Sequence, residues 1–163
     1  MPGGFVGETM CDSATLAFLA GRGAKASYVT SVCNGSLVLA AAELLDGYRS
    51  ATHWAARGHL AQLGVEVSTE RVCIDRNTIS GGGVTAGIDF GLTIVAHVFG
   101  DDVVRFCQLA AEYDPKPPFD AGSPEKAGRS RRRPRRGRPD FPQAHEPPLL
   151  ELVATALSGH VTR

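Results

Sequence analysis

Cys33 is the residue of this sequence best placed to do chemistry. Residues 27–32 before it read as a buried strand, and the small residues and apolar run after it predict a helix over 36–45. A strand that turns sharply into a helix holds the turning side chain at the carboxyl edge of a sheet, where the first N–H groups of the helix are free. Such a position favours a thiolate and predicts a nucleophile. The alternative is that Cys33 is a small buried residue, as most free cysteines are.

Several other patterns accompany this cysteine. They are the opening Met1-Pro2-Gly3-Gly4, the segment Ala51-Thr52-His53-Trp54, residues 79–89 (ISGGGVTAGID), residues 108–115 (QLAAEYDP) and residues 118–124 (PFDAGSP). In this order and spacing the set resembles the ThiJ/PfpI family of the class I glutamine-amidotransferase-like superfamily. Within it, isonitrile hydratases and the amidotransferase-like domains of AraC-type regulators are most alike. The resemblance covers about residues 1–127.

The resemblance implies a role for each matched residue. Cys33 corresponds to the family's nucleophile, and the backbone N–H of Asn34 to a donor that binds developing negative charge. The Gly3 and Gly4 turn corresponds to the second donor, where glycine lets a backbone amide approach the substrate closely. His53 corresponds to a histidine beside the cysteine, which acts as a general base or stabilises the thiolate. The alternative for His53 is a half-buried histidine hydrogen-bonded to backbone.

Two departures from the family pattern bear on activity. Isonitrile hydratase-like members carry threonine after the cysteine, where this chain has Asn34. The family also begins with two strand–helix units before the Pro-Gly-Gly turn, one of which supplies an acidic residue that contacts the cysteine. Neither unit has a counterpart here, so the sequence predicts a truncated member or a gene model that begins too late.

Alternating strand and helix patterns predict an α/β fold. The resemblance implies a three-layer α/β/α sandwich of the flavodoxin-like kind, with a mostly parallel sheet that lacks the first strand–helix units. Asp12 is expected to cap a helix that runs to Gly21, and Asp101 to cap one that runs to about Glu112. Residues 84–99 are apolar almost all round, which predicts a helix buried against the sheet. Ligands of such sheets sit at the carboxyl ends of the strands, where Cys33, His53 and the glycine turn converge.

Composition and charge divide the chain into three parts. Residues 1–125 hold 8 Lys and Arg against 14 Asp and Glu, a net charge of −6, whereas residues 126–163 hold 9 against 3, a net charge of +6. We therefore expect a domain over 1–127, a disordered basic and proline-rich linker over 128–148, and a tail over 149–163 that forms a short helix. Arginine runs without a folded module are weak evidence for nucleic-acid binding, so such a partner is not expected.

The four cysteines form no CxxC pair, and no histidine lies at metal-ligand spacing from one, so no metal or cofactor is predicted. Three glycines precede residue 84, but no phosphate-binding spacing or lysine accompanies them. No signal peptide or membrane-spanning run is visible, and free thiols indicate a cytoplasmic setting.

Three functions remain open. The first is a hydratase-like enzyme in which the Cys33 thiolate adds to a small electrophilic substrate. The second is a non-catalytic domain that senses a small molecule, as in the AraC-type regulators. The third is an inactive remnant of such a regulator, whose exposed apolar sheet edge would lead to aggregation or to a homodimer.

Overall fold

The computed structural model describes residues 1–128, in which five strands form two small sheets. The larger has the order β1-β5-β4, with β1 and β5 parallel and β4 and β5 antiparallel; the smaller pairs β2 with β3 in parallel. The strands are β1 (Val29–Val32), β2 (Arg49–Ser50), β3 (Glu66–Val67), β4 (Val72–Asp75) and β5 (Thr78–Gly81). Because β1 and β5 run in parallel, the ends of both lie at the same edge of the sheet.

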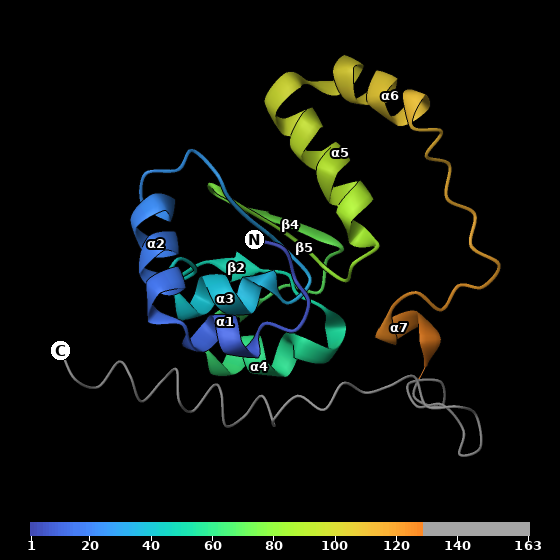
Figure 1. The fold of residues 1–163 in the computed structure, drawn as a ribbon. Helices are drawn as coiled ribbons and strands as arrows, with labels where there is room; N and C mark the ends of the chain where they lie inside the picture. The colour runs from blue at the N-terminus through green and yellow to red at the C-terminus, as the bar shows by residue number, and fades with distance from the viewer. Residues whose placement is uncertain (129–163) are drawn as a thin grey trace.

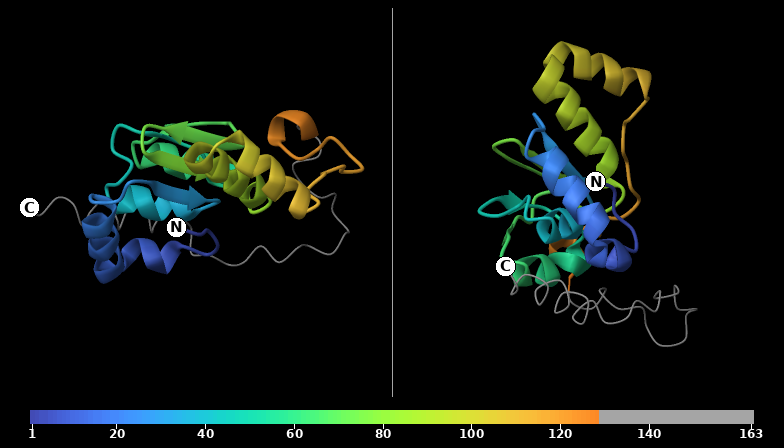
Figure 2. Two further views of the ribbon diagram at one scale, coloured as in Figure 1. Left: turned by 90° about the horizontal axis from the view of Figure 1, so that it is seen from above. Right: turned by 60° about the vertical axis from the view of Figure 1, so that its left-hand side comes forward.

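Helices cover both faces of the larger sheet. Helix α5 contacts β1, β4 and β5, while α3 packs on β1 and in turn contacts α1, α2 and α4. Figures 1 and 2 show the strands between these two groups of helices. The helices are α1 (Gly7–Cys11), α2 (Ser13–Gly23), α3 (Gly35–Ala41), the 3-10 turn η1 (Trp54–Ala56), α4 (Arg57–Gln62), α5 (Ala86–Phe99), α6 (Asp101–Ala110) and α7 (Pro124–Ala127). The molecule is thus a three-layer α/β/α arrangement of flavodoxin-like type.

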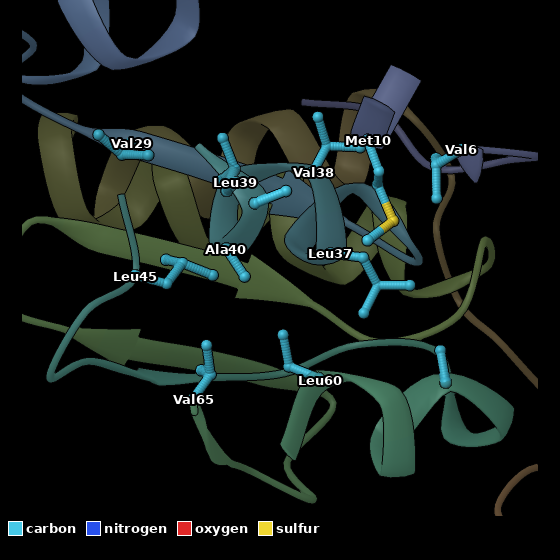
Figure 3. Packing of buried hydrophobic residues seen from close by; sticks show 12 residues of the cluster. Val6, Met10, Val29, Leu37, Val38, Leu39, Ala40, Leu45, Leu60 and Val65 are labelled. Carbon is cyan, nitrogen blue, oxygen red and sulfur yellow. The ribbon is translucent and has the colours of Figure 1, made fainter. Parts of the chain in front are cut away.

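The hydrophobic core lies on the α3 side of the sheet. Helix α3 is buried along its whole length, and Leu37 and Val38 are fully buried. Met10 of α1 and Leu60 of α4 pack around it, as Figure 3 shows. Helix α3 is therefore the central element that fixes where Cys33, two residues before it, is placed.

The local predictions near the cysteine are confirmed. Strand β1 ends at Val32, directly before Cys33, and α3 begins at Gly35, although it ends at Ala41 rather than at residue 45. Asp12 caps α2 by accepting from the Ala14 N–H at 3.2 Å. That helix extends to Gly23, two residues beyond the predicted end.

Two predictions about the C-terminal helices are wrong. Helix α5 is not buried all round: Ala86 is its one fully buried residue, and Ile88, Val98 and Phe99 are exposed. It packs on the three-stranded sheet and contacts α6, and these neighbours leave part of its surface exposed. Asp101 does not cap α6, because the N-cap position is Gly100, with φ of +86°. Asp101 lies instead in the first turn and pairs with Arg105 at 3.7 Å.

The predicted linker and tail lie outside the described residues, apart from Gly128. Within residues 1–128, no helix is long and apolar enough to span a membrane.

Candidate active site

Cys33 occupies a strained turn at the end of β1. Its φ is +57°, in the left-handed region that residues other than glycine rarely adopt. Its N–H donates to the carbonyls of Gly81, at 3.1 Å, and Gly82, at 2.7 Å. Its own carbonyl accepts from the hydroxyls of Ser36, at 3.2 Å, and Thr52, at 3.0 Å. Hydrogen bonds on both sides therefore hold the backbone of Cys33 in this conformation, which is the sharp strand-to-helix turn that the sequence predicts.

Three segments meet at this edge of the sheet. The parallel register sets Val32 beside Gly81, so Cys33 lies beside the glycines that follow β5. The segment after β2 is attached there as well, because the Ala51 N–H donates to Ser80 Oγ at 2.8 Å. Thr52, which follows, is 2% exposed and bonded to Cys33. The predicted convergence of Cys33 with the neighbourhood of His53 is therefore present.

The N-terminal segment lies against the same turn. Met1 is bonded to β1 at both ends: its amine donates to the Thr30 carbonyl, and its carbonyl accepts from Val32 N–H at 3.1 Å. A Cβ atom added at Gly3 would lie 2.6 Å from the Cβ of Cys33 and 2.7 Å from the backbone nitrogen of Asn34. Gly3 thus contacts the cysteine so closely that no other residue fits without a backbone shift.

Asn34 connects the cysteine to the glycine turn. Its side-chain Nδ2 donates to the Gly4 carbonyl at 3.2 Å, and Gly4 itself adopts a φ of +131°. Its Oδ1 lies 3.9 Å from Cys33 Sγ, as the acceptor of a thiol hydrogen bond. Gly3 and Asn34 therefore contact Cys33 directly, and Gly4 is joined to it through the Asn34 side chain.

His53 lies beside the glycine loop in a defined orientation. Its Nδ1 accepts from the Ala55 N–H at 3.3 Å, and its ring edge lies 3.2 Å from the Cβ position of Gly83. Partial burial, and secondarily the positive charge of Arg57, lower the pKa of His53. A neutral imidazole whose Nδ1 accepts carries its proton on Nε2, so this nitrogen is a donor rather than a base. His53 is thus a half-buried histidine bonded to backbone, which was the alternative to a catalytic role, and its action on the cysteine as a general base or as a stabiliser of the thiolate stays a prediction.

Thr52 and Ser36 are site residues to which the sequence reasoning gave no role. Both hydroxyls bind the Cys33 carbonyl and fix the turn. Ser36 had a local signal, since a hydroxyl three residues after a helix-start carbonyl commonly bonds back to it. Thr52 had none, because its contact depends on how the segment that follows β2 lies beside the turn at the end of β1.

The remaining cysteines differ from Cys33 in their surroundings. Cys73 is buried on β4, with its thiol 3.7 Å from the Arg49 carbonyl, and Cys11 is exposed on α1. All four cysteines, Cys107 included, are free thiols. Within residues 1–128, no three His, Cys, Asp or Glu side chains are grouped to hold a metal ion.

A free cysteine at a strained strand-to-helix turn, on the carboxyl edge of a flavodoxin-like sheet, defines a class of α/β proteins with a cysteine site. The family model of the DJ-1/PfpI family matches residues 1–97, so the chain belongs to the DJ-1/PfpI family.

Individual proteins show which members of the family this chain is similar to. Isonitrile hydratase of Pseudomonas putida is 52% identical over 128 residues, which cover 78% of this chain and 56% of the hydratase. The crystal structure of a ThiJ/PfpI family protein from Pseudomonas syringae superposes with a TM-score of 0.76 at 43% identity, covering 94% of this chain and 59% of that one. The HTH-type transcriptional regulator GbdR of Pseudomonas aeruginosa is 33% identical over 88 residues, or 53% of this chain and 24% of the regulator. The chain thus spans little more than half the length of the hydratase.

Proposed function

We propose that the protein is a cysteine-dependent hydratase that adds water to a small isonitrile. The observation that carries the proposal is Cys33, a free thiol held at φ +57° by four hydrogen bonds beside the Gly3–Gly4 turn. The backbone strain is typical of a functional residue, because a packing cysteine does not need a disfavoured conformation. Similarity to an isonitrile hydratase supports the choice of substrate class.

The proposed reaction proceeds through two additions at one carbon. The Cys33 sulfur forms a bond to the terminal carbon of R–N≡C while its S–H proton passes to that carbon, giving the thioimidate R–N=CH–S-Cys. Water then adds to the same carbon, and its proton passes to the nitrogen. The C–S bond breaks, the hydroxyl proton returns to sulfur, and R–NH–CHO leaves with the thiol regenerated. No oxidant or cofactor enters this balance.

The surrounding groups have defined roles in this scheme. The backbone N–H groups of Asn34 and Gly4 are proposed to stabilise negative charge on the oxygen of the tetrahedral adduct. The Nε2–H of His53, which lies next to the glycine loop, is proposed as a further donor to this charge. The close contact of Gly3 with Cys33 is proposed to keep the Gly4 amide beside the thiol.

The test is turnover of a small alkyl isonitrile by the purified chain, with the formamide detected by proton NMR. We expect Cys33→Ser to lower the rate at least about 10³-fold, since the variant lacks the nucleophile. Cys11→Ser, which alters an exposed thiol, is the matched control and should retain full activity. Turnover that survives in Cys33→Ser would rule out the proposed role of this cysteine.

A second candidate function is a domain that senses a small molecule without turning it over. The similarity to a transcriptional regulator favours it, as does the Asn34 carbonyl oxygen that faces the thiol. Calorimetry separates the two candidates: an isonitrile that binds stoichiometrically and leaves no formamide indicates sensing, whereas formamide indicates catalysis.

A further inference from the structure

Arg71 binds both ends of the glycine loop that supports Cys33. Arg71 directly precedes β4, and its carbonyl accepts from the Gly82 N–H at 2.9 Å. Its guanidinium donates to the carbonyl of Thr85, the N-cap residue of α5, at 2.8 Å. The Gly82 carbonyl in turn accepts from the Cys33 N–H at 2.7 Å. Arg71 therefore holds residues 82–85 at both ends, and these residues hold the cysteine turn.

A carboxylate and a phenol fix the guanidinium in this position. Its Nε donates to Oδ2 of Asp89, which lies in the first turn of α5. The other oxygen of that carboxylate, Oδ1, accepts from the Tyr113 hydroxyl at 3.1 Å. Tyr113 follows α6 and belongs to residues 108–115, a pattern to which the proposed reaction gives no role. Asp89 thus connects the start of β4, helix α5 and the segment after α6.

The exposure of this network favours a local role over a global one. The side chains of Arg71 and Asp89 are 51% and 32% exposed, and ion pairs this exposed contribute little to the free energy of unfolding. A planar guanidinium that binds a carboxylate and a carbonyl at once does fix orientation, because its donors have a rigid geometry. The network is therefore suited to holding the loop in place.

Displacement of the loop would disturb both sides of the site. The loop bonds to the Cys33 backbone, and a Cβ atom at Gly83 would lie 3.2 Å from the His53 ring. The left-handed conformation of Cys33 persists only while its surroundings enforce it. The position of residues 82–85 therefore decides whether the turn keeps its geometry.

We propose that Arg71 is a positioning residue that, together with Asp89 and Tyr113, fixes the glycine loop and through it the Cys33 turn. For catalysis this inference rests on the proposed function, because a displaced sulfur adds more slowly to the isonitrile carbon. It also gives residues 108–115 a part in the site.

The test is amide hydrogen exchange, followed by NMR on the purified chain without substrate. Arg71→Met keeps the aliphatic stem and the backbone carbonyl but removes the guanidinium. We expect exchange at the Cys33 and Gly82 N–H groups to become about threefold to tenfold faster. Exchange at the N–H of Met10, which is fully buried in α1, should stay unchanged.

Arg76→Met is the matched control for the loss of an arginine. Arg76 also binds a carboxylate, that of Asp75 at 3.3 Å, and a carbonyl, that of Gly47 at 2.6 Å. It lies in the β4–β5 turn, at the end of β5 opposite Gly81. This variant should therefore leave exchange at Cys33 as it is in the original chain.

Two further measurements complete the test. Tyr113→Phe removes a single hydroxyl and should give a smaller acceleration at Cys33. In the hydration assay, the kcat of Arg71→Met should fall about threefold to tenfold with little change in KM.

Three results would overturn the proposal. Unchanged exchange at Cys33 in Arg71→Met would show that the loop does not depend on the guanidinium. Equal acceleration at Cys33 and Met10 would show that Arg71 only stabilises the fold. Faster exchange with an unchanged kcat would show that the reaction does not need the loop to be fixed. An original chain that hydrates no isonitrile would refute the proposed function alone, because the exchange measurement uses no substrate and still decides whether Arg71 fixes the turn.

Discussion

At the scale of single residues, the turn at Cys33 is a balance of strain and hydrogen bonds. A left-handed conformation costs a residue other than glycine on the order of 1–3 kcal/mol and persists only when the surroundings enforce it. Here the enforcing groups are backbone carbonyls of the glycine loop on one side and the hydroxyls of Ser36 and Thr52 on the other. The hydroxyls are the part of this arrangement that substitution can remove without changing side-chain shape.

Thr52→Val should therefore loosen the turn. The change removes one hydrogen bond from the Cys33 carbonyl at a site 2% exposed, so we expect the free energy of unfolding to fall by about 1 kcal/mol. Cys33 should also alkylate faster, since its buried thiol becomes more accessible. Thr78→Val is the matched control, because it removes a comparable buried bond, to the Asp75 carbonyl at 2.9 Å, in the β4–β5 turn. Equal effects of the two variants on Cys33 alkylation would contradict this account.

His53 links protonation at the site to stability. Its pKa is lowered in the folded protein by burial and then by Arg57, so the unfolded chain binds the proton more readily. Its contribution to stability is therefore present above about pH 6.5 and is lost as pH falls through the pKa of His53 in the folded protein.

The variant His53→Asn tests this linkage. It keeps an acceptor for the Ala55 N–H but does not titrate, so urea unfolding should show a smaller loss of stability between pH 7 and pH 5 than in the original chain. His97→Gln controls for the loss of an imidazole, and parallel pH profiles for His53→Asn and the original chain would refute the linkage.

At the scale of elements, the N-terminal segment is part of the site because Met1 is bonded to β1 and Gly3 packs on the turn. Gly3→Ala should displace it, because the added Cβ would lie 2.6 Å from the Cβ of Cys33 and 2.8 Å from the Val32 carbonyl. We expect thermal unfolding to show a loss of about 1–3 kcal/mol. Gly21→Ala, in α2 with nothing within 4 Å of the new Cβ, should instead gain up to about 1 kcal/mol. Equal stability changes would mean that the segment does not pack as described.

The sequence predicted the elements around the site better than the contacts between them. The strand, Cys33 and the following helix form a local pattern, and the pattern predicted their order and the turn between them. The cap of α6 was missed because Gly100 and Asp101 are adjacent, and sequence preference cannot decide which of them leaves the helical conformation. The role of Thr52 depends on a contact across 19 positions of the chain, and no local pattern records it. Periodicity showed that residues 84–99 are apolar but not which neighbours cover them.

At the scale of the whole molecule, the C-terminal helices α5 and α6 carry several exposed large apolar side chains. Figure 1 shows α5 and α6 as a pair that projects from the sheet, away from α1–α4. Its exposed side chains are Ile88, Val98, Phe99, Val103, Phe106 and Leu109. Large apolar side chains that are exposed on neighbouring helices favour association with a partner or aggregation.

We expect the purified chain to self-associate through this surface in a concentration-dependent manner, which light scattering after size-exclusion chromatography would measure. Phe106 is 71% exposed, so Phe106→Glu should shift the population toward the monomer while leaving the unfolding temperature nearly unchanged. Phe18→Glu is the matched control, since Phe18 is 65% exposed on α2, outside the α5–α6 pair. If both variants associate as the original chain does, the α5–α6 surface is not the contact. If both variants become monomeric, the added negative charge itself prevents association. A specific α5–α6 interface would be disrupted only by a carboxylate placed within it, as in Phe106→Glu.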